Sequence, residues 1–327
     1  MKRTLLAGAV ACLAAVSVAA TATVGGGQAQ GGPGWAALEP SPLQRTEVAA
    51  ALLDGTIYVM GGFVPEGGDT GRMVAYDVAA DDWSEVAPHP IAVNHAGLVA
   101  AQGRIYAHGG QRGPGGGPLS ARLTRYNPAT DRWKRVSDSP TARAAMAFLG
   151  RGDRLYAIGG RTAASGRSRA LEIYDISQDR WHRGPDLEVG RNHLAGAASG
   201  DEILAIGGRP GPIIGNRRTV ERWRIGSGAW EPAQPLGTAR SGAVAIALAS
   251  GDVVAFGGEE LGGGGNAIEQ VERLDAETGE WSYLPDMATP RHGLGGATDG
   301  SRLYAIEGGP SPGLHYSSAN EYLDPAP

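Results

Sequence analysis

An internal repeat of about 50 residues constrains the fold of this chain more than any other feature. Six pairs of glycines, each at the end of a short apolar run, recur along the sequence: Gly61-Gly62, Gly109-Gly110, Gly159-Gly160, Gly207-Gly208, Gly257-Gly258 and Gly308-Gly309. Their separations are 48, 50, 48, 50 and 51 residues. Six tryptophans follow nearly the same spacing: Trp35, Trp83, Trp133, Trp181, Trp230 and Trp281. Two independent markers with one period predict six copies of one structural unit.

Each unit has the pattern of four short strands. An apolar run such as residues 56–60 precedes the glycine pair and is typical of a buried strand. A second run ends on an aromatic residue seven positions before the unit's tryptophan, as in Tyr76 and Trp83. A variable loop joins these two runs, and a short hairpin turn containing Asp or Asn joins the second run to the strand with the tryptophan. Six such units predict an all-β, six-bladed propeller with four antiparallel strands per blade.

The glycine pairs, the Tyr-Asp steps and the spaced tryptophans are the kelch signature. The chain resembles the kelch-repeat family over about residues 35–324. It is more distantly similar to the periplasmic mutarotases of sialic acid in length and blade number. The resemblance implies the propeller fold, but kelch propellers include both enzymes and binding modules, so it leaves the function open.

The two ends of the repeat region predict how the ring closes. Tyr322 takes the aromatic position of the sixth unit, yet the sequence ends at Pro327 before another tryptophan. Trp35 has no unit before it. We therefore expect the segment with Trp35 to supply the outermost strand of the sixth blade, which removes a free sheet edge. The predicted propeller domain spans residues 35–327.

The N-terminal residues have the pattern of a secretory leader. Lys2 and Arg3 precede an apolar run, and residues 20–22 offer a small-residue cleavage site. We predict a signal peptide over residues 1–22, a flexible linker over 23–34 and a secreted, extracellular or periplasmic protein. An uncleaved anchor and a lipoprotein attached through Cys12 are the alternatives. Cys12 is the one cysteine of the sequence, so a cleaved chain has no thiolate.

Composition and motifs exclude several functions. The formal net charge of −5 disfavours nucleic acid as a partner, and no membrane span is expected after signal cleavage. Paired cysteines, HExxH and the Asp-rich calcium loop are missing, so no metal and no cofactor are predicted. The glycine-rich run 113–118 lacks the Gly-Lys-Ser/Thr of a phosphate-binding loop. A copper-radical oxidase of the galactose oxidase type needs a cysteine that the cleaved chain lacks.

Ten residues after each tryptophan lies one position at the start of the innermost strand, which we call the slot. Five of its six residues are arginine: Arg45, Val93, Arg143, Arg191, Arg240 and Arg291. Because neighbouring strands are antiparallel, the slots and the residues after the glycine pairs meet on one face. Arg161 and Arg209, which follow two of these pairs, join Arg143 and Arg191 there. Relatives that bind acidic peptides resemble this chain here, in arginines at the same strand-start position.

The slot arginines permit two interpretations. As ligand contacts, their guanidinium groups would bind carboxylate or sulfate in bidentate geometry at the mouth of the central funnel. As braces they would bond backbone carbonyls or acidic side chains within the propeller. His95 and His193, two residues after the slot, are candidate ligand contacts on the same side as the arginines. Alternation along the strand places His292 on the other side.

Two functions remain open. The first is a secreted binding scaffold whose arginine-rich mouth takes an acidic peptide or protein segment or an anionic saccharide. The second is a mutarotase for an acidic sugar, in which Glu259 or Glu260 beside Arg240 moves the anomeric proton. The sialic acid mutarotases usually carry long loop insertions that this chain lacks, which favours the scaffold. The sequence does not specify the oligomeric state.

Overall fold

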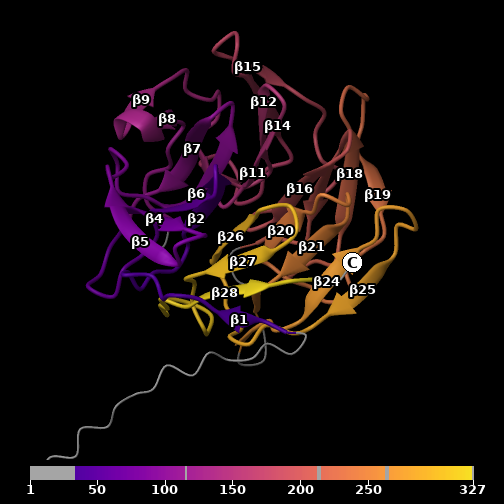
Figure 1. The fold of residues 1–327 in the computed structure, drawn as a ribbon. Coiled ribbons are helices and arrows are strands. Elements are labelled where there is room, and N and C mark those ends of the chain that lie inside the picture. Colours follow the sequence, from indigo (N-terminus) through magenta and orange to yellow (C-terminus); the bar gives the residue numbers. More distant parts are fainter. Residues whose placement is uncertain (1–33, 115, 212–214, 262–264, 326–327) are drawn as a thin grey trace, which may run out of the picture. The chain divides into compact units, whose positions relative to one another are not determined.

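The described residues form six four-stranded antiparallel sheets arranged around a central axis (Figure 1). The structure, a computed structural model, describes residues 34–114, 116–211, 215–261 and 265–325, all within one unit, Gly31–Pro327. The predicted signal peptide and the predicted linker up to residue 33 lie outside these residues. The predicted all-β, six-bladed propeller with four antiparallel strands per blade is confirmed.

Within each blade the four strands run from the axis outward. Those of blade 1 are β2 (Ala49–Leu53), β3 (Thr56–Met60), β4 (Met73–Asp77) and β5 (Asp82–Val86). Those of blade 2 are β6 (Asn94–Ala101), β7 (Arg104–Gln111), β8 (Leu123–Asn127) and β9 (Arg132–Arg135). Those of blade 3 are β11 (Ala147–Arg151), β12 (Arg154–Ile158), β14 (Leu171–Asp175) and β15 (Arg180–Arg183).

The remaining blades follow the same order. Those of blade 4 are β16 (Ala195–Ser199), β17 (Glu202–Ile206), β18 (Val220–Arg224) and β19 (Glu231–Ala233). Those of blade 5 are β20 (Val244–Ala247), β21 (Val253–Phe256), β24 (Val271–Leu274) and β25 (Trp281–Leu284). Those of blade 6 are β26 (Gly295–Thr298), β27 (Leu303–Ile306), β28 (Asn320–Leu323) and β1 (Ala36–Ala37).

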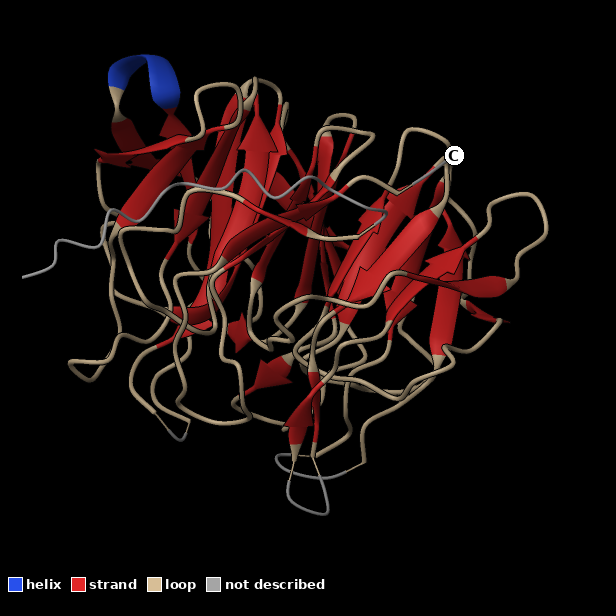
Figure 2. Cartoon of the chain, turned by 60° about the horizontal axis from the view of Figure 1, so that its bottom comes forward, coloured by secondary structure: helices blue, strands red, loops and turns tan. Residues whose placement is uncertain are grey.

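Two small ribbons and one helical turn complete the described structure. The ribbons pair β10 (Arg143–Ala144) with β13 (Arg161–Thr162) and β22 (Glu259–Glu260) with β23 (Asn266–Ala267). The turn is a 3₁₀ helix, η1 (Pro128–Thr130), at the edge of the molecule in Figure 2. No helix among the described residues is long and apolar enough to cross a membrane.

The core is divided among the gaps between neighbouring blades. The innermost strands contact one another in the cyclic order β2, β6, β11, β16, β20, β26 and back to β2. Each gap holds one buried apolar cluster with residues from both of its blades. Between blades 1 and 2, for example, Met60 and Tyr58 pack with Ile105 and Tyr126. Blade-to-blade packing therefore provides the hydrophobic stabilisation of the ring.

Strand β1 closes the ring as predicted. It pairs with β28, with Ala36 opposite Tyr322 and Ala37 opposite Glu321. One further step of this register puts Trp35 opposite Leu323, just as Trp281 lies opposite Leu274 in blade 5. Leu323, rather than Tyr322, therefore holds the aromatic position in blade 6, so that assignment was wrong by one residue.

In blades 1 to 5 the first glycine of each pair has a left-handed backbone and no room for a side chain. Gly61 has φ 72°, and a Cβ there would lie 2.6 Å from the carbonyl oxygen of Val93 in the next blade. In blade 6 the residue at this position is Glu307, with φ 55°, and Gly308 takes the second position, donating its N–H to the Arg45 carbonyl. The sixth pair is thus displaced by one residue from the Gly308-Gly309 that its sequence suggests.

Candidate functional site

The five slot arginines lie inside the blades rather than at the funnel mouth. Their side chains are at most 1% exposed: Arg45, Arg143, Arg191, Arg240 and Arg291. Their guanidinium groups donate to backbone carbonyls of their own blade, as Arg191 does to Gly207, Thr219 and Ala205 at 2.8, 2.8 and 3.3 Å. A ligand at the mouth has no access to them.

Each slot arginine also has a buried carboxylate partner. Four of these partners occupy the same place on the third strand of the same blade: Glu172, Glu221, Glu272 and Glu321, at 2.8, 2.8, 2.7 and 3.0 Å from Arg143, Arg191, Arg240 and Arg291. In blade 1 this place holds Val74, and Arg45 instead pairs with Glu307 of blade 6 at 2.7 Å. The geometry supports the bracing interpretation for all five arginines.

The position two residues after the slot forms a ring around the axis. Its members all have positive φ between 51° and 63°: Glu47, His95, Ala145, His193, Gly242 and Gly293. Around this ring, from His95 to Gly293, each N–H donates to the carbonyl of the preceding member at 2.8–3.2 Å. The Val48 N–H completes the circle by donating to the Gly293 carbonyl at 3.1 Å. The ring thus brings one residue of every blade to the axis.

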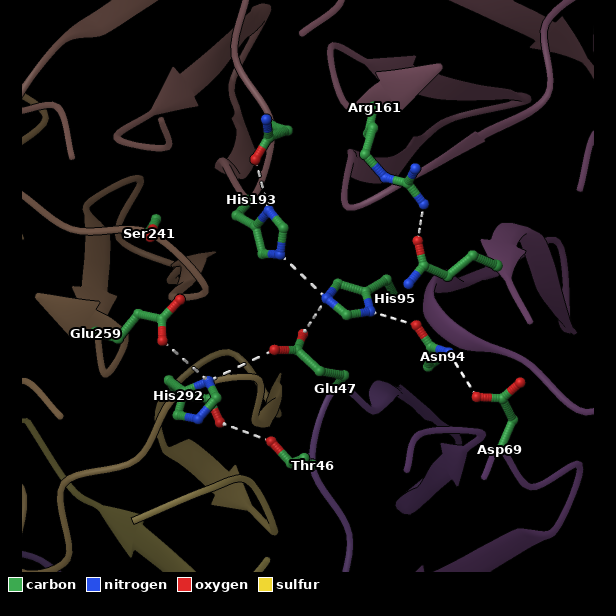
Figure 3. Close-up of polar contacts among 12 residues, drawn as sticks. Thr46, Glu47, Asp69, Asn94, His95, Arg161, His193, Ser241, Glu259 and His292 are labelled. Atoms are coloured by element: carbon green, nitrogen blue, oxygen red, sulfur yellow. Dashed lines mark hydrogen bonds and ion pairs between the residues drawn. The ribbon is translucent and has the colours of Figure 1, made fainter. Parts of the chain in front are cut away.

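The three polar side chains of this ring meet at the axis (Figure 3). His95 Nε2 lies 3.0 Å from His193 Nε2 and 3.2 Å from a carboxylate oxygen of Glu47. We call Glu47, His95 and His193 the axial cluster. The left-handed backbone at the two histidines breaks the strand alternation, so they point to the axis while the slot arginines point into the blades. The predicted common side for histidines and arginines was therefore wrong.

His292 also reaches this cluster, contrary to the prediction from strand alternation. Its Nδ1 lies 3.5 Å from Glu47 and 3.7 Å from Glu259. Burial opposes a charge on His292, but the contact with Glu47 and the two carboxylate charges outweigh burial and raise its pKa. Burial lowers the pKa of His95 and takes that of His193 well below its usual value, so both are neutral at pH 7.

Arg209 and Glu259 are bound to each other beside the axial cluster. Arg209 donates to Glu259 at 2.5 Å, to Ser241 at 3.0 Å and to His193 Nε2 at 3.1 Å. Glu259 is 4% exposed, whereas Glu260 is exposed to solvent. Arg161 is half-buried and donates to the side-chain oxygen of Gln111. Of the seven candidate arginines, therefore, Arg161 alone keeps substantial exposure.

A separate basic pocket opens on the loops of blades 3 and 4. Its volume is about 310 Å³, and its lining includes Arg167, Arg169 and Arg217 together with Glu188 and Val189. The three arginines and Glu188 are exposed. Arg167 and Arg217 have no carboxylate within ion-pair distance in the part of the chain that the structure describes. The loops that carry them connect the second and third strands, so they rise on the same face as the axial cluster.

Comparison with known proteins identifies the family. The model of the KLHDC2/KLHL20/DRC7 Kelch-repeats domain matches residues 35–208, which is more than half of the chain. The chain belongs to the kelch-repeat family. This confirms the resemblance that the glycine pairs and tryptophans indicate.

Kelch relatives of known sequence match shorter segments. Kelch-like protein terF of Aspergillus terreus is 40% identical over 70 residues, covering 20% of this chain and 15% of that protein. Kelch-like protein 35 of Mus musculus is 30% identical over 77 residues, covering 24% of this chain and 12% of that protein. This kelch chain thus matches only a small part of the length of these relatives.

A solved structure has the same fold. The structure of YjhT aligns with this kelch propeller at a TM-score of 0.73, covering 86% of this chain and 95% of that chain, with 17% sequence identity. At this identity the likeness concerns the fold alone.

Sequence reasoning missed Glu47 and the basic pocket. Glu47 lies two residues after Arg45, in the same column as His95 and His193, so aligning the six units by their slots would have found it. The pocket arginines lie on loops of different length in each unit, and the repeat gives no alignment there.

Proposed function

We propose that this kelch protein is a secreted interaction scaffold that binds an anionic ligand in the basic pocket between blades 3 and 4. The ligand is an acidic peptide segment or an anionic saccharide. The observation that carries the proposal is the exposure of Arg167 and Arg217, without carboxylate partners in the described structure, on one pocket of about 310 Å³. The ligand would bind on the face of the propeller that carries the axial cluster, as the sequence predicts. Its contacts would be the exposed pocket arginines instead of the buried slot arginines.

The chemistry of the pocket supports this choice. A guanidinium offers several N–H donors in a planar fork, which suits carboxylate and sulfate groups. Arg169 is held in place by a hydrogen bond from Nε to the Leu187 carbonyl, so its charge is fixed at the pocket wall. The volume lies at the lower end of the range for small-ligand sites, which fits a single sugar ring or a few peptide residues.

The mutarotase alternative has less support. It placed a proton-carrying glutamate beside Arg240, but Arg240 is buried with Glu272 and Glu259 is bound to Arg209. Glu260 is exposed, yet it lies on β22 in blade 5, away from the pocket between blades 3 and 4. We therefore do not assign a reaction, and free sialic acid enters the test below as a ligand.

The test is isothermal titration of the purified protein with a sulfated glycan, a carboxylated glycan, sialic acid, an acidic peptide and a neutral sugar. We expect binding of one of the anionic ligands and no binding of the neutral sugar. The affinity should fall as salt rises from about 0.05 M to about 0.5 M, because the exposed charges are screened. The double substitution Arg167→Ala and Arg217→Ala should weaken the affinity at least about tenfold, since each charge-assisted hydrogen bond contributes about 1.5–3 kcal/mol.

The matched control removes two other exposed arginines. Arg132 on β9 and Arg180 on β15 are exposed and lie on outer strands away from the pocket. Their double substitution by alanine changes the net charge equally and should leave the affinity unchanged. Equal weakening in both double variants would mean a nonspecific charge effect, and absence of binding by every anion would remove the proposal.

A further inference from the structure

We propose that Glu47, His95 and His193 hold a first-row divalent transition-metal ion, such as Zn²⁺, on the axis of the propeller. The proposal goes beyond the anion-binding function and does not depend on it. One ligand atom from each of these residues lies within 4.8 Å of the other two. The three come from blades 1, 2 and 4, so the metal would join three separate parts of the ring.

The hydrogen bonds of the two histidines fix their tautomers. His95 Nδ1 faces Asn94 Oδ1, and His193 Nδ1 faces Asn192 Oδ1 at 2.6 Å. The asparagine orientations are themselves determined, because each Nδ2 donates elsewhere: that of Asn94 to Asp69 at 2.6 Å and that of Asn192 to the Gly166 carbonyl at 2.5 Å. Both asparagine oxygens are therefore acceptors, and both Nδ1 atoms carry the proton.

This arrangement leaves two lone pairs facing each other. With the proton on Nδ1, the Nε2 atom of each neutral histidine is an acceptor, and these two acceptors lie 3.0 Å apart. The carboxylate of Glu47, 3.2 Å from His95 Nε2, adds a third acceptor. One of the three, His193 Nε2, receives an N–H from Arg209 at 3.1 Å. The lone pairs of His95 Nε2 and Glu47 still repel each other unless a cation lies between them, and either a metal ion or a shared proton would relieve this repulsion.

The surroundings favour the metal ion over the proton. Histidine ligands of metal ions commonly donate the N–H of their other ring nitrogen to a fixed acceptor, and here the side-chain oxygens of Asn94 and Asn192 are those acceptors. A cavity of about 100 Å³ borders all three side chains, which is room for an ion with its water. The other axial members are Ala145, Gly242 and Gly293, so their short side chains leave this space open.

The donor set indicates which metal binds. Two imidazole nitrogens and one carboxylate suit zinc, copper, iron and nickel, rather than calcium or magnesium. At zinc–nitrogen distances of about 2.0–2.1 Å, two nitrogens on one tetrahedral ion lie about 3.3 Å apart. The histidines would thus separate by a few tenths of an ångström. Arg209 would have to release its hydrogen bond to His193 Nε2, and it would keep Glu259 and Ser241 as partners.

The experiment titrates the chelator-treated protein, purified without a polyhistidine tag, with Zn²⁺ and with Co²⁺. We expect one ion per chain, the visible absorption of Co²⁺ bound to nitrogen and oxygen, and a higher melting temperature with Zn²⁺. In nitrogen NMR, Zn²⁺ should shift the Nε2 resonances of His95 and His193. The exposed His182 on β15 should not shift.

Variants separate the cluster from other metal-binding groups. The double substitution His95→Ala and His193→Ala should abolish saturable binding, and His182→Ala should leave it unchanged. Because the double variant can lose stability, Glu47→Gln, of nearly equal size, and Asn192→Ala are measured as well. Asn192→Ala should weaken binding about 10- to 100-fold through loss of the outer hydrogen bond.

Two outcomes would overturn the proposal. The first is a Kd weaker than about 1 mM, at which binding contributes only about 4 kcal/mol. The second is an affinity that is the same in the wild type, the double variant and Glu47→Gln. In either case the axial cluster is not a metal site.

Discussion

At the scale of single residues, the surroundings of each guanidinium separate two kinds of arginine. A slot arginine such as Arg191 is desolvated and needs the carboxylate of Glu221 and several carbonyls to compensate. A pocket arginine such as Arg217 stays in water and keeps its donors for a ligand. The sequence contains a sign of this difference, because a glutamate lies two residues before the aromatic position in units 3, 4 and 5.

His108 provides a pH test at the same scale. It is 1% exposed, donates from Nδ1 to the Arg122 carbonyl at 3.1 Å and packs between Phe148 and Trp181. Its Nε2 has no hydrogen-bond partner in the described structure. Burial, assisted by the charge of Arg143, lowers the pKa of His108 to about 3. Protonation therefore favours the unfolded chain, where the pKa of histidine is about 6.5.

The stability that depends on neutral His108 is present above about pH 6.5 and is lost as the pH falls toward 3. We expect the free energy of unfolding of the wild type to fall relative to His108→Leu by up to about 1.4 kcal/mol per pH unit in this window. Urea unfolding of both proteins at several pH values measures the difference. If the free energies of unfolding of the two proteins change with pH in parallel, folding does not lower the pKa of His108 and the prediction fails.

At the scale of elements, the repeat predicts the blades but not every register. The glycine pairs and tryptophans mark strand ends in five units. Neighbouring backbone comes too close to these glycines for a side chain, and the tryptophans pack against the aromatic position of their blade. In blade 6, Glu307 occupies a left-handed position and Leu323 replaces an aromatic residue. Both shifts accompany the joining of the two chain ends, where Glu307 also pairs with Arg45. Pattern matching cannot detect them, because Gly308-Gly309 imitates the glycine pair one residue after its true position and Tyr322 imitates the aromatic residue one residue before it.

The short strand β1 is expected to stabilise the entire ring. It pairs with β28, and Trp35 lies directly before it. The centroid of the Trp35 ring lies 5.6 Å from that of Phe256, and the indole N–H of Trp35 donates to the Pro285 carbonyl at 3.1 Å. Deletion of the chain through residue 40 should lower the melting temperature sharply, since it exposes the edge of β28 and the cluster between blades 5 and 6. Calorimetry measures the change.

The control for this truncation is Glu39→Ala, because Glu39 is exposed and its backbone groups persist in the variant. The Glu39→Ala variant should have the same melting temperature as the wild type. A truncated chain that melts at the wild-type temperature would contradict closure by β1.

At the scale of the whole molecule, the sixfold ring determines which residues meet. Glu47, His95 and His193 are 48 and 98 residues apart in sequence, yet the backbone ring around the axis brings them into contact. No local motif contains this spacing, which is why the sequence showed no metal site. The basic pocket likewise forms between loops of two blades, Arg167 in one and Arg217 in the next. Sequence alone placed His95 and His193 on the face of the slots, but it could not predict their contacts with each other or with Glu47.

The buried slot arginines brace the propeller, and we propose that the exposed loop arginines bind the ligand. The most direct measurement is the free energy of unfolding of Arg191→Ala in urea, compared with that of Arg217→Ala. Removing Arg191 leaves Glu221 buried without its partner, and we expect a loss of about 3–5 kcal/mol. Arg217→Ala, at an exposed position, should stay within about 0.5 kcal/mol of the wild type. If Arg191→Ala keeps the wild-type stability but no longer binds anions, the slot arginines are ligand contacts rather than braces.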